Sequence, residues 1–98
     1  MKNLHLRLKD YEIEAIKQVV SEYDANASIY LYGSRTDKNK KGGDIDLLVL
    51  SSKISFSERI YIRMKLKDRI GDQKIDLLVK KTPDTAFAQM ALEQGVLL

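Results

Sequence analysis

The chain has 98 residues, of which 44% are hydrophobic and 32% charged, and its formal net charge is +3 at pH 7. This length suits one small domain, so residues 1–98 are expected to form a single domain, and the composition excludes a disordered or membrane-embedded chain. No stretch is apolar enough to cross a bilayer, and the N-terminal residues alternate charged and apolar side chains where a secretory signal needs a continuous apolar run. A cytoplasmic protein is therefore expected.

The chain has no cysteine and a single histidine, His5, which limits its chemistry. Disulfides, thiolate zinc sites and cysteine nucleophiles are excluded, and one histidine near a terminus, expected to be an incidental surface residue, cannot build a histidine metal site. Any metal ion must therefore be bound by oxygen. The surplus of positive charge indicates either solvated side chains or a surface that attracts phosphates or an acidic partner. It comes mostly from Lys38, Lys40, Lys41, Arg59, Arg63, Lys65, Lys67 and Arg69.

The first two elements predicted along the chain are a helix and a strand. Asp10 can cap a helix over residues 11–23, because acidic residues occupy its first turn and apolar residues recur at helical spacing. The segment over residues 28–32 carries isoleucine and tyrosine and ends at Gly33, which indicates a strand running into a tight turn. The apolar face expected for the helix consists of Ile13, Ile16, Val20 and Tyr23.

The middle of the chain is predicted to be a loop, a strand and a second helix. A lysine-rich loop over residues 35–43 leads to a strand over residues 45–50, whose near-continuous apolarity indicates burial on both faces. Ser55 and Glu58 form a capping box that opens a helix ending at Gly71. The apolar face expected for this helix consists of Phe56, Ile60, Met64 and Ile70.

A strand over residues 74–79 and a last helix complete the predicted order. Thr82 and Pro83 are expected to cap and begin this helix, and Gly95 to lie past its end. The order helix, strand, strand, helix, strand, helix predicts an α/β (α+β) fold with a small mixed three-stranded sheet and flanking helices. The apolar face expected for the last helix consists of Ala86, Phe87, Met90 and Ala91.

One pentapeptide, Ile-Asp-Leu-Leu-Val, occurs twice, at residues 45–49 and 75–79. The helix between the two copies is long enough to cross over between parallel neighbouring strands, and this would place Asp46 beside Asp76 at one edge of the sheet. A short loop after the first strand returns the chain to the same edge. The turn at Gly33 and the aspartates are therefore expected to converge.

Asp44, Asp46 and Asp76 stand where carboxylates are costly, because the start of a buried strand removes them from water. Asp44 and Asp46 project from one face of a strand, and Asp76 is expected to join them. Like charges this close repel unless a cation neutralises them, and Mg²⁺ prefers oxygen ligands of this kind. The pattern predicts a site for Mg²⁺, with room for a pair of ions. The alternative is that the aspartates cap turns or pair with nearby lysines.

Gly33, Ser34 and Arg35 indicate a phosphate site beside the aspartates. Glycine lets the backbone approach a ligand closely, Ser34 offers its hydroxyl and neighbouring amides, and Arg35 can add a charge-assisted contact. The alternative is a simple turn that ends a strand. The lysine-rich loop that follows could cover a triphosphate or be an ordinary flexible loop, and Tyr30 and Tyr32 are expected to pack rather than to stack on a nucleotide.

The run Gly33-Ser34-Arg35, followed by Gly42-Gly43 and Asp44-Ile45-Asp46, closely resembles the signature of the DNA polymerase β-like nucleotidyltransferases, and more narrowly that of the minimal nucleotidyltransferases of prokaryotes. The later Ile75-Asp76-Leu77 matches the place of that family's third acidic position, so the resemblance covers nearly the whole chain. Many relatives have a small residue such as serine where this chain has Gly43.

The resemblance implies a role for each matched residue. Gly33 and Ser34, with Arg35 beside them, would bind the nucleotide phosphates. Asp44 and Asp46 would be metal ligands, and Asp76 would help to bind metal and deprotonate the acceptor hydroxyl. The implied reaction is Mg²⁺-dependent transfer of a nucleotidyl group, AMP from ATP, to an acceptor hydroxyl.

The resemblance also implies a partner. Minimal nucleotidyltransferases are commonly paired with a helical HEPN protein in toxin–antitoxin modules, so the chain is expected to be the antitoxin of a HEPN-family toxin and to form a homo- or hetero-oligomer. Two alternatives stay open: a non-catalytic partner that neutralises a HEPN ribonuclease by complex formation, and an enzyme that modifies an antibiotic or a nucleic-acid end. Membrane association is not expected, and nucleic-acid binding by the basic surface is the least favoured possibility.

Overall fold

The computed structural model describes residues 6–39 and 43–98. His5, Lys40, Lys41 and Gly42, on which several expectations fell, lie outside the described residues. In chain order the elements are α1 (Asp10–Tyr23), β1 (Ser28–Tyr32), the 3₁₀ turn η1 (Gly33–Thr36), β2 (Ile45–Leu50), α2 (Phe56–Ile70), β3 (Ile75–Lys80), α3 (Ala86–Gln94) and β4 (Val96–Leu97).

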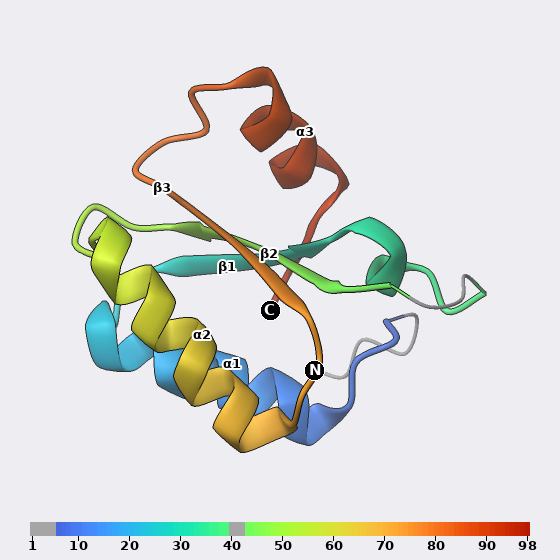
Figure 1. The fold of residues 1–98 in the computed structure, drawn as a ribbon. Helices are drawn as coiled ribbons and strands as arrows, with labels where there is room; N and C mark the ends of the chain where they lie inside the picture. Colours follow the sequence, from blue (N-terminus) through green and yellow to red (C-terminus); the bar gives the residue numbers. More distant parts are fainter. Residues whose placement is uncertain (1–5, 40–42) are drawn as a thin grey trace.

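The strands form one mixed sheet in the order β3-β2-β1-β4, with α1 and α2 on one face and α3 on the other (Figure 1). β1 runs antiparallel to β2 and to β4, whereas β2 and β3 are parallel, joined by the crossover helix α2. The predicted α/β fold and the parallel pairing of the two pentapeptides are confirmed. The expected number of strands is wrong by one, because β4 has two residues and is too short to show a strand period in the sequence.

Two groups of buried side chains hold the layers together. The larger one fills the space between the sheet and α1 and α2, and the smaller one, centred on Tyr32, Leu48 and Ala91, lies between the sheet and α3. Alternate residues of β2 and β3 serve the two groups, since successive strand side chains point to opposite faces. Asp46 is therefore on the α3 face with Leu48, and this face carries the smaller group. None of the described helices is long and apolar enough to cross a membrane.

The apolar face predicted for α2 is wrong except for Ile70. Phe56, Ile60 and Met64 are 74%, 43% and 58% exposed, and the buried residues are Ile62, Leu66 and Ile70. Both sets repeat every four residues and are offset by two, which is about 200° around a helix. The sheet and α1 select one of two nearly opposite apolar faces, and the other stays in solvent.

Helix beginnings also depart from expectation. The N-cap of α3 is Thr85, whose hydroxyl accepts a hydrogen bond from Ala88 N at 3.1 Å, so the helix begins three residues after the predicted Thr82–Pro83 start. Within α3 the buried residues are Ala88 and Ala91, while Phe87 is 53% exposed.

At the start of α1, Lys9 is the N-cap residue instead of Asp10, and its N–H donates to Glu12 Oε1 at 2.8 Å. The capping box of Ser55 and Glu58 is confirmed, with Glu58 N donating to Ser55 Oγ at 3.2 Å and Ser55 N to Glu58 Oε1 at 2.9 Å.

Candidate active site

The parallel pairing of β2 and β3 places two of the predicted aspartates side by side. Asp46 and Asp76 are partners in the β2–β3 ladder, and Tyr32, at the end of β1, is the partner of Asp46 in the antiparallel β1–β2 ladder. Three strands thus bring their ends to one edge of the sheet, as expected from the repeated pentapeptide. Gly33 follows Tyr32 directly, so the turn and the aspartates do converge.

The carboxyl group of Asp46 is in an environment that disfavours its charge. Burial, the charge of Asp76, a side-chain hydrogen bond with Asp76 and the charge of Asp44 together raise the pKa of Asp46 to about 6, against a smaller opposing effect of Lys74. Burial and the charges of Asp46 and Asp76 also raise the pKa of the Tyr32 hydroxyl. These shifts show a local excess of negative charge at a partly desolvated position.

Asp44 lies just before β2 and is paired with a lysine. Its Oδ2 lies 3.5 Å from Lys74 Nζ, and its side chain is 38% exposed. Within residues 6–39 and 43–98, no three histidine, cysteine, aspartate or glutamate side chains converge closely enough to hold a metal ion by themselves. The paired carboxyl groups of Asp46 and Asp76, with Asp44 near them, nevertheless fit Mg²⁺, because this ion is usually bound by one or two carboxylates with waters and substrate phosphates completing its octahedron.

Two glycines allow the backbone to close around these groups. Gly33 has φ of +79°, and a Cβ at this position would overlap the Asp46 carboxylate. Gly43 has φ of +94°, and a Cβ there would overlap the Ser34 hydroxyl oxygen. Gly33 therefore packs directly on Asp46, and Gly43 on Ser34. This second contact explains why a glycine precedes Asp44 here: even serine would need a Cβ where Ser34 Oγ lies.

Arg35 is held on the side of η1 that faces the N-terminal segment. Its Nη1 donates to the Arg7 carbonyl at 2.9 Å, its Nη2 to Gln73 Oε1 at 3.1 Å, and its Nε to the Gly43 carbonyl at 3.4 Å. Gln73 in turn donates to Glu12 Oε2 of α1 at 2.6 Å. The guanidinium thus ties η1 to α1 and to the start of β3, and it fixes the backbone next to Ser34.

Asp46 and Asp76 open into a cleft of about 560 Å³ between the sheet, α2 and α3. Its polar lining residues include two aspartates and two arginines, and its apolar ones include Tyr32 and Phe87, which are in edge-to-face contact at 5.8 Å. The complete lining is Tyr32, Gly33, Asp46, Arg59, Arg63, Asp76, Leu77, Leu78, Phe87, Met90 and Gln94. This combination of charged and apolar lining residues suits a ligand that carries both phosphates and a ring.

Arg59 and Arg63 are cleft residues that the sequence did not single out from the basic cluster of α2. Lys65 of that cluster donates to Glu22 of α1 at 3.1 Å, whereas Arg59 and Arg63 line the cleft. Arg59 Nη1 donates to the Leu77 carbonyl at 3.4 Å, which places α2 along the outer edge of β3. The four-residue spacing of the two arginines puts both on one helical face. This spacing identifies them as cleft residues only once the position of α2 is known.

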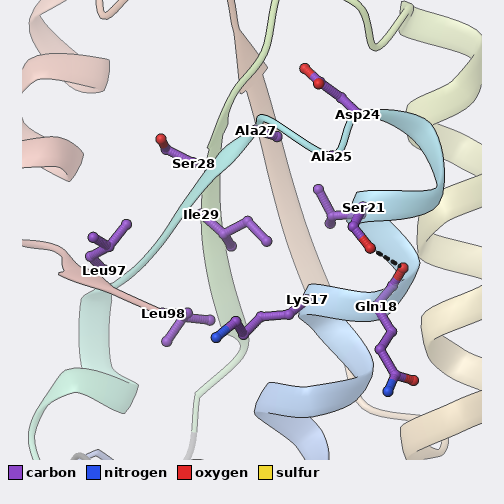
Figure 2. Close-up of a pocket in the computed structure, with 11 residues that line it drawn as sticks. Lys17, Gln18, Ser21, Asp24, Ala25, Ala27, Ser28, Ile29, Leu97 and Leu98 are labelled. Atoms are coloured by element: carbon purple, nitrogen blue, oxygen red, sulfur yellow. Dashed lines mark hydrogen bonds between the residues drawn. The ribbon is translucent and has the colours of Figure 1, made fainter. Parts of the chain in front are cut away.

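A second hollow, of about 350 Å³, lies between the end of α1, β1 and the last two residues, Leu97 and Leu98 (Figure 2). It shares no lining residue with the cleft. Its one carboxylate, Asp24, accepts a hydrogen bond from Ser51 Oγ at 2.6 Å, which together with the Asn26 N–H lowers the pKa of Asp24. Because this carboxylate already has structural partners, the cleft at Asp46 and Asp76 is the better candidate site.

The fold and the site together define a class of protein. A mixed four-stranded sheet with three helices, a glycine turn and paired aspartates at one edge is consistent with a polymerase β-like nucleotidyltransferase domain. Residues 14–98 match the family described as polymerase beta, nucleotidyltransferase, and the chain therefore belongs to this family. Its members typically use divalent metals and nucleoside triphosphates. A comparison with curated proteins finds no match to the chain.

Proposed function

We propose that the chain transfers a nucleotidyl group, AMP from ATP, to an acceptor hydroxyl in a Mg²⁺-dependent reaction. The observation that carries this proposal is the pairing of Asp46 with Asp76 in a cleft lined by both charged and apolar side chains. An excess of negative charge that raises the pKa of Asp46 is relieved when a divalent cation binds. Family membership over residues 14–98 supports the same reaction class.

The described residues have distinct parts in this proposal. Asp44, Asp46 and Asp76 would bind Mg²⁺. Two Mg²⁺ ions would be bound once the triphosphate completes the coordination of both. When bound, the metal supplies positive charge that offsets the charge developing on the phosphate oxygens. Gly33 and Ser34 would contact the phosphates through backbone amides and the Ser34 hydroxyl. Arg35, by its three hydrogen bonds, would keep the Ser34 backbone in place.

The chemical step is a displacement at the α-phosphorus. The acceptor oxygen forms a bond to the α-phosphorus while the bond from that phosphorus to the bridging oxygen of pyrophosphate breaks, and the acceptor proton passes to the Asp76 carboxylate. Arg59 and Arg63 line the same cleft as the aspartates, and their charges would favour the negatively charged leaving group. An ATP-dependent reaction of this kind would take place in the cytoplasm.

The partner completes the proposal. We propose that a separate helical protein of the HEPN family supplies the acceptor hydroxyl and that the chain is the antitoxin of this toxin. A second candidate is a non-catalytic antitoxin that neutralises a HEPN ribonuclease by complex formation alone. The specific observation that favours this second candidate is the exposed apolar face of α2, which suits contact with another protein.

Transfer of label distinguishes these two candidates. The chain would be incubated with ATP labelled in its α-phosphate, MgCl₂ and the helical protein encoded next to it. If the chain is an enzyme, the partner should become labelled. The variants Asp44→Asn and Asp76→Asn should not label the partner, although both should still bind it in size-exclusion chromatography. If the intact chain transfers no label but still forms the complex and suppresses ribonuclease activity, the second candidate is correct and the catalytic proposal is wrong.

A further inference from the structure

We infer that a groove between α2 and β3, directly beside Asp76, binds an acidic, partly apolar segment of the protein that supplies the acceptor hydroxyl. This α2–β3 groove has a volume of about 290 Å³. Besides Asp76 it is lined by Ile60, Arg63, Met64, Lys67, Lys74 and Ile75. The inference rests on the proposed function in one respect, namely that the acceptor reacts next to Asp76.

The apolar wall of the groove belongs to the face of α2 that the sheet leaves uncovered. Ile60 and Met64 are 43% and 58% exposed, and Phe56, one turn earlier, is 74% exposed. These three side chains form a continuous stripe at four-residue spacing. A stripe of large apolar side chains in solvent is typical of a protein-binding surface, especially when polar residues border it.

The charges around the groove determine which kind of protein segment fits. Arg63, Lys67 and Lys74 line it with a single carboxylate, Asp76, so the groove presents an excess of positive charge. The other basic residues of α2 differ, since Lys65 pairs with Glu22 of α1 at 3.1 Å and Arg69 donates to Gln18 at 2.6 Å. An acidic segment with apolar residues on one side would satisfy both the stripe and the cations.

A polypeptide fits these residues better than RNA does. Ile60, Met64 and Ile75 are aliphatic or thioether side chains, which do not offer the aromatic stacking that single-stranded nucleic acids use. Asp76 also lines the groove, and its negative charge disfavours a phosphate backbone there. The groove therefore combines apolar contact with positive charge, the pattern expected for an acidic amphipathic helix or strand.

The groove and the cleft share a wall. Asp76 and Arg63 line both hollows, so a segment bound in the groove would lie next to the residue that pairs with Asp46 in the cleft. A hydroxyl carried on such a segment would meet the α-phosphate of a nucleotide bound in the cleft at Asp76. The α2–β3 groove would thus select the acceptor protein, while the cleft binds the nucleotide.

The test uses the full chain and a fluorescein-labelled peptide of about 20 residues, designed as a helix with leucine along one face and glutamate along the other. Fluorescence anisotropy is measured without nucleotide or metal, so that binding is separated from catalysis. We expect the peptide to bind, and the double variant Ile60→Gln/Met64→Gln to weaken binding about tenfold, because the lost contacts are apolar. Lys67→Glu should weaken binding and reduce its salt dependence.

Matched controls decide the interpretation. Tyr11 is 55% exposed on α1, away from the groove, so Tyr11→Gln should leave the peptide affinity unchanged. A peptide with lysine in place of glutamate should not bind. Ser34 does not line the groove, so Ser34→Ala should bind the acidic peptide like the intact chain even where it transfers less label, which separates a failure of this inference from a failure of the proposed activity.

Three outcomes would overturn the inference. One is absence of binding of the acidic peptide, and a second is equal binding by the Ile60→Gln/Met64→Gln variant with an unchanged melting temperature. The third is tighter binding of a single-stranded RNA of about 20 nucleotides that the same variants weaken, which would assign the groove to nucleic acid.

Discussion

Asp46 and Asp76 are direct partners in the parallel β2–β3 ladder, and their carboxyl groups interact closely enough for Asp76 to raise the pKa of Asp46. In the observed register the two identical pentapeptides pair residue by residue, and this juxtaposes their aspartates. The cost of this pairing is highest when both carboxyl groups are ionised. The protein without metal should therefore respond to pH, to cations and to removal of either charge.

The first prediction concerns the pH dependence of stability without metal. The pKa of Asp46 is about 6 in the folded chain and 3.8 ordinarily, so the folded state binds more protons between these values and stability falls as pH rises through this window. Asp46→Asn removes the penalty and should raise the free energy of unfolding at pH 8 by roughly 1–2 kcal/mol, less than the full shift because the group is partly solvated. Denaturant unfolding in the presence of EDTA measures the free energy of unfolding of both proteins. Near pH 3 the two proteins should have equal stability, and an advantage for Asp46→Asn that persists there would contradict the electrostatic explanation.

The second prediction concerns metal binding. If Mg²⁺ binds the folded chain with a Kd of about 1 mM, 10 mM MgCl₂ should stabilise it by about 1.4 kcal/mol, or roughly 5–10 °C in melting temperature. Differential scanning fluorimetry with and without MgCl₂ tests this, and Asp46→Asn should show little shift. Equal shifts in the two proteins would mean that the ion acts elsewhere.

The third prediction uses two glycines with similar backbone angles. Gly43 and Gly71 have φ of +94° and +89°, but a Cβ at Gly43 would overlap Ser34 Oγ, whereas nothing lies within 4 Å of one at Gly71. Gly71→Ala should cost only the backbone strain, about 1 kcal/mol, while Gly43→Ala should cost more and weaken ATP binding by displacing Ser34. Chemical denaturation and calorimetric titration with ATP provide the two measurements. Equal effects on ATP affinity would show that the Gly43–Ser34 contact does not matter for the nucleotide.

The fourth prediction separates two arginines near the site. Arg35 makes hydrogen bonds with the Arg7 carbonyl and with Gln73, so Arg35→Ala should destabilise the fold by about 1.5–3 kcal/mol. Arg63 is exposed on α2 and lines the cleft, so Arg63→Ala should change stability by less than about 0.5 kcal/mol but lower ATP affinity. Melting temperature and ATP titration are compared for both variants. The reverse pattern would assign the phosphate contact to Arg35 and a structural part to Arg63.

The fifth prediction concerns Lys74, whose Nζ lies 3.5 Å from Asp44 Oδ2 and which partly lowers the pKa of Asp46. This lysine supplies a positive charge near the carboxylates and competes with a metal ion for them. Lys74→Met should therefore tighten Mg²⁺ binding about two- to fivefold at low salt, consistent with an exposed ion pair worth up to about 1 kcal/mol. Isothermal titration with MgCl₂ measures the change, which should shrink at high ionic strength. Weaker Mg²⁺ binding in this variant would mean that Lys74 orients Asp44.

Sequence alone predicted the element order and the meeting of the aspartates because those features depend on local patterns. Three local features limit the possible arrangements of the strands even when the packing is unknown. They are the repeated Ile-Asp-Leu-Leu-Val, the crossover helix and the glycine turn. The capping box at Ser55 and Glu58 is equally local. The positions of Asp44, Asp46 and Asp76 along the strands follow from these features, whereas their roles as ligands stay predictions.

What the sequence did not predict depends on contacts between distant elements. α2 has two apolar faces with the same period, and only the positions of α1 and the sheet decide that Ile62 and Leu66 are buried while Met64 is exposed. The hydrogen bonds of Arg35 to Gln73 and Arg7 join residues far apart in the chain and were not predicted, whereas its contact with phosphate stays a prediction. β4 is a strand only because β1 leaves an edge for Val96 and Leu97 to pair with.

The duplicated pentapeptide lets the same side chain be compared in two environments within one molecule. Leu48 and Leu78 are ladder partners in identical sequence contexts, yet Leu48 is 0% exposed on an inner strand whereas Leu78 is only partly buried on the outermost one. Truncating each to alanine removes the same atoms, so the difference between the two losses in stability comes from strand position and not from residue type. A loss of about 2–5 kcal/mol is expected for Leu48 and a smaller one for Leu78. The two leucines thus allow the contribution of an inner strand position to the free energy of unfolding to be measured within one protein.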